Sequence, residues 1–165
     1  MNVLATLPVL GSTVVLRRAS AQDVPAIVEL LAADQLVATR DGITTVEDLE
    51  PYLRAFEAIH TDPAHLLLVA TEDAQILATM QLSFLPGLAR RGALRAQIGA
   101  VRVGKGYRGR GLGAALFGWA IQEARRRDCA LVQLTTDKSR AETHRFYEHL
   151  GFVASYVGLK LQLIP

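Results

Sequence analysis

The stretch RVGKGYRGRGLGAAL, residues 102–116, combines five glycines with the mobile cations Lys105, Arg108 and Arg110. Alternating apolar residues before it predict a strand, and apolar residues at helical spacing after it predict a helix. Glycine lets backbone amides turn toward a ligand, and the first turn of a helix carries unpaired N–H donors and a partial positive charge. This strand, loop and helix therefore predict an anion-binding site.

Three known patterns of glycine-rich loops can be compared with these residues. A Walker A loop requires Lys-Ser or Lys-Thr after its last glycine, where this chain has Leu112. Gly104, Gly106 and Gly109 match the dinucleotide pattern Gly-x-Gly-x-x-Gly, but further glycines follow where that pattern already lies inside a helix. A nucleotide-binding domain is therefore the less favoured alternative. The third pattern, Arg-x-x-Gly-x-Gly-Ala, covers residues 108–114.

This third pattern resembles the pyrophosphate loop of the GCN5-related N-acetyltransferase (GNAT) superfamily, Gln/Arg-x-x-Gly-x-Gly/Ala. SRAETHRFYEHLGF, residues 139–152, is similar to the last helix of the family and the strand entry after it. VVLRRASAQDVPAIVELL, residues 14–31, is similar to its opening strand and first helix. The resemblance implies a single N-acetyltransferase domain over residues 1–165, with its core at about 13–163. The implied α/β fold has a mixed, mostly antiparallel sheet with a splayed central strand pair, flanked by about four helices.

The resemblance also implies an activity, the transfer of an acetyl group from acetyl-CoA to a primary amine of a small molecule by direct attack in a ternary complex. Tyr147 would protonate the departing thiolate, since a phenol pKa of ~10 is close enough to that of a thiol at ~8.5. A core tyrosine is the alternative, because Tyr147 shares a helix face with Thr143 and Leu150. The residues implied to bind the coenzyme are Val101, Arg102, Val103, Arg108, Gly109, Arg110, Gly111, Leu112, Gly113 and Ala114.

The chain departs from the family at Gly99, where members often carry a glutamate that acts as the general base. Asp41, Glu142, His144 and His149 remain as candidates, with surface charges as the alternative explanation. We therefore hypothesise that the amine is captured deprotonated or loses its proton through water. Because this glutamate is missing, a non-catalytic acyl-CoA sensor of the same fold remains an alternative function.

The resemblance places two loops over the acceptor cleft. They carry Arg40 and Asp41 in the first loop and Arg90 and Arg91 in the second. Their arginines would favour an acceptor with an anionic group, although loop arginines are commonly only solvated.

The composition of the 165 residues limits the function classes. A net charge of +2 argues against a nucleic-acid partner, and the apolar runs are too short to suggest a membrane partner. The one cysteine, Cys129, permits no internal disulfide and no cysteine metal cluster, so we expect no metal and a cytoplasmic location. The expected partners are acetyl-CoA and a small amine, with a homodimer left open.

Hydrophobic periodicity and capping patterns predict the remaining elements. Strands are expected over residues 13–18, 66–71, 75–84, 96–103 and 131–136, with closing strands over 152–163. Capping boxes are expected at Ser20 with Asp23 and at Ser139 with Glu142, and Gly151 is expected to end the last helix. A further helix is expected over residues 46–59. The helix after the glycine loop is expected to bury a stripe of Leu112, Leu116, Trp119, Ala120 and Ala124.

Overall fold

The computed structural model describes residues 2–9, 11–33 and 41–164. The chain divides into two compact units, Met1–Gln133 and Leu134–Pro165.

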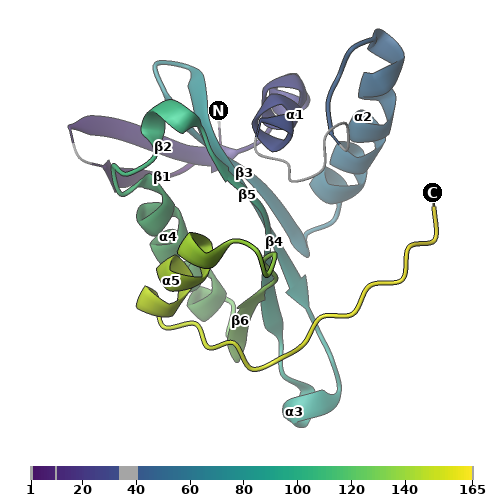
Figure 1. Cartoon of the computed structure of the whole chain (residues 1–165), viewed down its shortest axis with the longest axis vertical. Helices are drawn as coiled ribbons and strands as arrows, with labels where there is room; N and C mark the ends of the chain where they lie inside the picture. The colour runs from purple at the N-terminus through teal and green to yellow at the C-terminus, as the bar shows by residue number, and fades with distance from the viewer. Residues whose placement is uncertain (1, 10, 34–40, 165) are drawn as a thin grey trace. The chain divides into compact units, whose positions relative to one another are not determined.

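The first unit is built on a sheet whose strand order follows the chain (Figure 1). Its strands are β1 (Val3–Val9), β2 (Ser12–Arg18), β3 (His65–Glu72), β4 (Gln75–Leu85), β5 (Arg95–Val103) and β6 (Leu131–Leu134). Each neighbouring pair from β1 to β5 is antiparallel. The predicted mostly antiparallel α/β fold is confirmed, whereas β1 had no counterpart among the expected elements.

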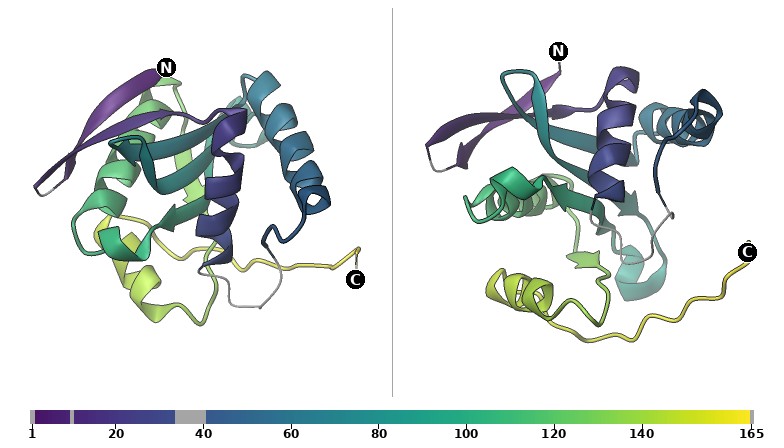
Figure 2. Two further views of the ribbon diagram at one scale, coloured as in Figure 1. Left: turned by 90° about the horizontal axis from the view of Figure 1, so that it is seen from above. Right: turned by 45° about the horizontal axis from the view of Figure 1, so that its top comes forward.

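Helices cover both faces of this sheet (Figure 2). Two helices, α1 (Val24–Ala32) and α2 (Val46–Thr61), lie on one face, and α4 (Leu112–Arg126) lies on the other. Short 3₁₀ turns, η1 (Ala21–Asp23) and η2 (Lys105–Tyr107), precede α1 and α4. The one-turn α3 (Ala89–Gly92) connects β4 to β5. With α5 of the second unit, the described residues hold five α-helices, one more than expected because α3 was expected as loop.

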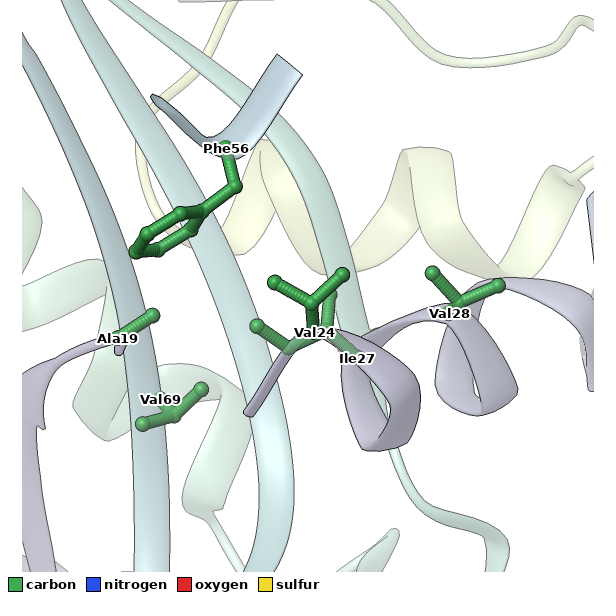
Figure 3. Packing of buried hydrophobic residues seen from close by; sticks show 6 residues of the cluster. All are labelled: Ala19, Val24, Ile27, Val28, Phe56 and Val69. Atoms are coloured by element: carbon green, nitrogen blue, oxygen red, sulfur yellow. The ribbon is translucent and has the colours of Figure 1, made fainter. Parts of the chain in front are cut away.

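A hydrophobic cluster fixes α1 and α2 on the sheet (Figure 3). Val69 of β3 is fully buried, and Phe56 of α2 is 6% exposed. Burying each such side chain contributes about 1.5–3 kcal/mol, so this cluster holds the two helices against the β3 side of the sheet. Its members are Ala19, Val24, Ile27, Val28, Phe56 and Val69.

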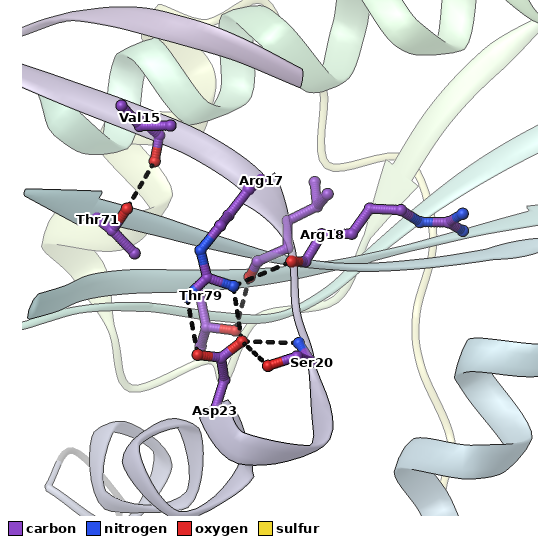
Figure 4. A network of polar contacts seen from close by, with 8 residues as sticks. Val15, Arg17, Arg18, Ser20, Asp23, Thr71 and Thr79 are labelled. Atoms are coloured by element: carbon purple, nitrogen blue, oxygen red, sulfur yellow. Dashed lines mark hydrogen bonds and ion pairs between the residues drawn. The ribbon is translucent and has the colours of Figure 1, made fainter. Parts of the chain in front are cut away.

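A polar network anchors the start of α1 (Figure 4). Asp23 accepts hydrogen bonds from the Ser20 amide at 2.7 Å and the Ser20 hydroxyl at 2.9 Å, which confirms the first capping box. Both Asp23 oxygens also bind the guanidinium of Arg17, at 2.7 and 2.8 Å. Burial raises the pKa of Asp23, but its bonds to Arg17 and Ser20 outweigh burial and hold it below 3.8.

The prediction for α4 is wrong at one position. Phe117, rather than Trp119, completes the buried stripe and is 1% exposed. Trp119 is half-buried, and the guanidinium carbon of Arg126 lies 5.7 Å from its ring centroid. The indole lies at the margin of the helix–sheet interface, where an adjacent cation can reach its face.

The second unit contains α5 (Ala141–His149). The prediction of a capping box at Ser139 and Glu142 is wrong, because Ser139 instead binds the Asp137 carboxylate through its amide at 2.9 Å and its hydroxyl at 2.7 Å. Gly151 ends the helix as predicted, with φ of 94° and an amide bond to the Glu148 carbonyl at 3.0 Å.

The expectation of closing strands over residues 152–163 is also wrong. Residues 152–164 contain neither helix nor strand, and Leu159, Leu161 and Leu163 are 85–92% exposed. Apolar alternation favours an extended backbone, but a strand also requires a paired neighbour, and the structure gives this segment none.

Candidate functional site

The glycine loop presents the amino end of α4 to solvent. Gly109 and Gly111 have φ of 74° and 85°, a conformation that favours glycine over residues with a side chain. Gly111 is the N-cap, and no side chain caps the helix. The amides of Leu112, Gly113 and Ala114 have no acceptor within the helix, so this end can bind an anion.

Cations surround this helix end. Lys105, Arg108 and Arg110 are all exposed. Arg108 donates from Nε to the Val103 carbonyl at 3.1 Å, and the guanidinium carbon of Arg110 lies 5.7 Å from the ring centroid of Tyr107. These contacts keep the positive charges beside the loop, which favours a polyanion such as a pyrophosphate.

A bulge interrupts β5 just before the loop. Gln81 pairs with Gly99 and Thr79 with Arg102, so two residues of β5 oppose Met80 alone. Ala100 within the bulge has φ of 50°. Such a backbone conformation costs an alanine about 1–3 kcal/mol and commonly marks a functional position. A bulge also leaves a residue outside the regular ladder, so its backbone is available to a ligand.

At Gly104 the end of β5 lies close to β4. The Gly104 amide donates to the Leu77 carbonyl at 2.8 Å. A Cβ at Gly104 would lie 3.3 Å from that oxygen and 3.7 Å from Leu30 Cδ2, so glycine allows close packing here. Gly99 differs, because a Cβ there would meet nothing within 4 Å. The space above Gly99 is therefore open to a substrate.

Polar side chains that were not anticipated lie beside Gly99. Register places Ser83 opposite both His65 and Gln97, and Gln81 opposite Gly99. Directly opposite residues share a face of the sheet, so these side chains lie on one face. Ser83 and His65 are 18 positions apart, and only the pairing of β3 with β4 brings them together.

Tyr147 lies in the second unit, on α5. Its side chain is half-buried, and its ring centroid lies 5.5 Å from that of Phe146 and 5.9 Å from that of Phe152. Among the described residues of α5 none is fully buried, and Tyr147 packs against the two aromatic rings of its own unit. Its role as an acid stays a prediction.

The histidines proposed as bases bind backbone carbonyls within the second unit. His144 Nε2 lies 3.0 Å from the Asp137 oxygen, and His149 Nδ1 lies 2.6 Å from the Arg145 oxygen. Glu142 is exposed in the first turn of α5. These contacts orient both imidazoles, and a role of either residue as a base stays a prediction.

The residues expected at the acceptor cleft fall in two regions. Asp41 accepts a bond from Tyr52 Oη at 3.4 Å, beside α2. Arg90 and Arg91 are exposed in α3, with φ of 54° and 59°. Arg40 lies outside the described residues. A hollow of about 500 Å³ lies between α1 and residues 42–44, which follow Asp41 in the chain.

The described part of the chain offers neither a metal site nor a membrane-spanning helix. No cluster of three or more histidine, cysteine, aspartate or glutamate residues could hold a metal ion there. Within the same residues, the helices are too short or too polar to cross a membrane.

A family model decides the classification of this chain. The model described as the acetyltransferase (GNAT) family matches residues 27–152. The chain belongs to the GNAT acetyltransferase family. The cosubstrate of this family is acetyl-CoA, and the helix end, cations and strand bulge described above suit its pyrophosphate and extended arm.

Solved structures show the same fold over most of the GNAT chain. A Bacillus halodurans C-125 protein described as a transcriptional regulator is 41% identical, with a TM-score of 0.86 over 91% of this chain and 99% of its own. A putative acetyltransferase from Agrobacterium tumefaciens is 32% identical, with a TM-score of 0.77 over 89% and 98%. Glucosamine-6-phosphate N-acetyltransferase from Arabidopsis thaliana shares 22% identity and a TM-score of 0.75 over 93% and 100%. No curated protein matches the chain.

Proposed function

We propose that this GNAT protein transfers the acetyl group of acetyl-CoA to the primary amine of a small molecule, in the cytoplasm. The single observation that carries the proposal is the uncapped, cation-flanked helix end that follows a strained bulge in β5. The helix end suits the coenzyme pyrophosphate. The bulge lies where the acetyl end of the coenzyme would reach along β5.

The proposed reaction is direct attack in a ternary complex. Amides of the β5 bulge polarise the thioester carbonyl, and the amine attacks the acetyl carbon from the open space above Gly99. Tyr147 gives its phenolic proton to the leaving thiolate. Arg90, Arg91 and Arg40 favour an acceptor that carries an anionic group as well as its amine.

A non-catalytic acyl-CoA sensor is the second candidate. Gly99 supports it, because the family's usual glutamate is missing there. The Bacillus halodurans relative, described as a transcriptional regulator, is a second reason to test it. A sensor would bind acetyl-CoA tightly and leave the thioester intact.

Thiol release separates the two candidates. The protein would be mixed with acetyl-CoA and a panel of alkylamines, amino acids, amino sugar phosphates, aminophosphonates and peptides, and free coenzyme A thiol would be recorded. Calorimetry with coenzyme A alone would measure binding in parallel. Amine-dependent thiol release supports the transferase, whereas micromolar-range binding without release from any amine supports the sensor.

A further inference from the structure

A polar row crosses the sheet on the face that carries α1 and α2. Register aligns His65 of β3, Ser83 of β4 and Gln97 of β5. Gln133 of β6 extends the row by donating from Nε2 to Gln97 Oε1 at 2.7 Å. The same face carries Gln81 and the buried Thr79 of β4 opposite the apolar Leu67 and Val69 of β3, so the row belongs to a larger polar strip along β4.

The bond between His65 and Ser83 has the form of a proton relay. His65 Nδ1 lies 2.8 Å from Ser83 Oγ, and Gln81 Nε2 donates to the same oxygen at 3.5 Å. Asp62 Oδ2 lies 3.8 Å from His65 Nε2 on the far side of the ring. A carboxylate there favours the tautomer with hydrogen on Nε2, which leaves Nδ1 to accept from the serine hydroxyl.

The surroundings of His65 suit a group that gains a proton. Its side chain is 28% exposed and that of Asp62 is 50% exposed, so both remain in contact with water. Arg18 of β2 donates to the backbone carbonyl of His65 at 3.2 Å, and Arg127 donates to the carbonyl of Pro63 at 3.3 Å. Among the described residues, Asp62 provides the carboxylate within ion-pair distance of the ring.

Ser83 also lies within reach of the open space above Gly99. Gln81 pairs with Gly99, and Ser83 is two residues further along β4, which makes Ser83 a diagonal neighbour of Gly99. Diagonal neighbours across a sheet are about 7–8 Å apart, a gap that a small amine or an amine with one water spans. Gly99 has no side chain to stand between them, and a Cβ added there would meet nothing within 4 Å.

We propose that Ser83 and His65 take the proton from the acceptor ammonium, replacing the glutamate that Gly99 lacks. The proposal rests on the proposed amine acetyltransfer. The ammonium N–H bond breaks and its proton passes to Ser83 Oγ, directly or through one water. Ser83 passes its own proton to His65 Nδ1, and the freed nitrogen lone pair attacks the acetyl carbon. The positive charge moves from the ammonium to the imidazole, where His65 acts through Ser83 as a positioning and proton-accepting residue.

The first test is the pH dependence of kcat/KM with propylamine and with 3,3,3-trifluoropropylamine, two probes of similar shape and different basicity. The parent should show a limb at the same pH for both amines, as expected when the titrating group belongs to the enzyme and not to the amine. His65→Gln and Ser83→Ala should lose this limb and lower kcat/KM at pH 7 by about 10- to 100-fold. Ser83→Thr, which keeps the hydroxyl, should retain it.

His60→Gln is the matched control for His65→Gln, since His60 is exposed on α2 and stacks on Phe56 at 5.1 Å. It should leave the profile unchanged. Coenzyme A affinity should also be unchanged in every variant, so a loss of binding would reveal a general structural defect. A parent-like profile in His65→Gln would overturn the relay while leaving the acetyltransferase proposal intact.

A second measurement does not depend on turnover. The four histidines can be resolved in long-range ¹H–¹⁵N spectra, with His→Gln variants assigning each one. In the parent, His65 should be the Nε2–H tautomer at high pH, and Ser83→Ala should shift the ¹⁵N resonances of His65 but not those of His60. An unshifted His65 signal in Ser83→Ala would overturn the relay, even if no amine proves to be a substrate.

Discussion

Gln81 and Gly99 lie directly opposite each other where β4 meets β5, immediately before the bulge at Ala100. This pairing places the amide side chain of Gln81 opposite a residue that has no side chain. Glycine weakens a strand interior, and neither a positive φ nor a close contact requires it at Gly99. The residue is therefore best explained by the room it leaves for a substrate.

Gly99→Glu tests that explanation. The new side chain should fit without loss of thermal stability, but it should fill the acceptor space and raise KM for the amine about tenfold, or ~1.4 kcal/mol. Gly99→Ala should stay within about threefold of the parent. Steady-state kinetics with the best amine of the panel would measure both variants. A higher kcat/KM for Gly99→Glu at neutral pH would mean instead that the carboxylate acts as a base and that the space is not needed.

Ala114→Glu tests the coenzyme site with effects of opposite sign on stability and binding. Ala114 is exposed in the first turn of α4, where an acidic side chain should stabilise the helix by about 0.3–1 kcal/mol. The same charge should repel the pyrophosphate and weaken coenzyme A binding at least tenfold, or ~1.4 kcal/mol. Gly111→Glu is less informative, because its φ of 85° would strain any side chain.

Calorimetry and thermal unfolding would measure the two effects of Ala114→Glu. Gln122→Glu, on the exposed part of the same helix, is the control and should bind coenzyme A like the parent. Unchanged binding in Ala114→Glu would locate the coenzyme elsewhere.

Local signals in the sequence were sufficient for much of the fold and for the coenzyme loop. Ser20 and Asp23 lie three residues apart, so their capping box depends only on a short stretch of chain. The turn between β3 and β4, with Asp73 and Ala74 at φ of 45° and 67°, also follows from short-range pattern. The glycine spacing around Gly111 likewise revealed the helix end.

Features that depend on partners distant in sequence were missed. Ser83 meets His65 only because β3 and β4 pair in one register, and a shift of one residue would turn Ser83 to the other face. Ser139 offered a capping pattern with Glu142, but the nearer Asp137 carboxylate competes for its hydroxyl. The alternating apolar residues after Gly151 predicted strands, yet pairing depends on a neighbour that local pattern cannot supply.

Tyr147→Phe tests the proposed acid. The phenyl ring keeps the contacts with Phe146 and Phe152, so the fold of the second unit and coenzyme A affinity should be retained. The loss of the hydroxyl should lower kcat by about 10- to 1,000-fold. Tyr156→Phe, at a tyrosine that is 83% exposed, provides the same chemical change as a control. A parent-like kcat at saturating amine would assign Tyr147 a packing role only.

The ion pair between Arg17 and Asp23 determines the last prediction, which concerns stability at low pH. Their side chains are 13% and 10% exposed. Because bonds to Arg17 and Ser20 hold the pKa of Asp23 below 3.8, the unfolded chain takes up this proton first as the pH falls. The contribution of Asp23 to stability is therefore fully present above pH 3.8 and is lost as the pH falls through the folded-state pKa.

Asp23→Asn should remove that contribution at every pH. The variant should unfold about 2–3 kcal/mol more easily at pH 7, because the Arg17 guanidinium stays largely buried without its carboxylate. It should also lose less stability than the parent between pH 5 and pH 3, since one carboxylate that binds a proton on unfolding is gone. Urea unfolding at several pH values would measure both effects. Asp73→Asn, at the exposed β3–β4 turn, is the control and should match the parent at pH 7 within about 0.5 kcal/mol. An Asp23→Asn variant with parent-like stability at pH 7 would show that Ser20 and the apolar cluster, rather than the ion pair, fix the start of α1.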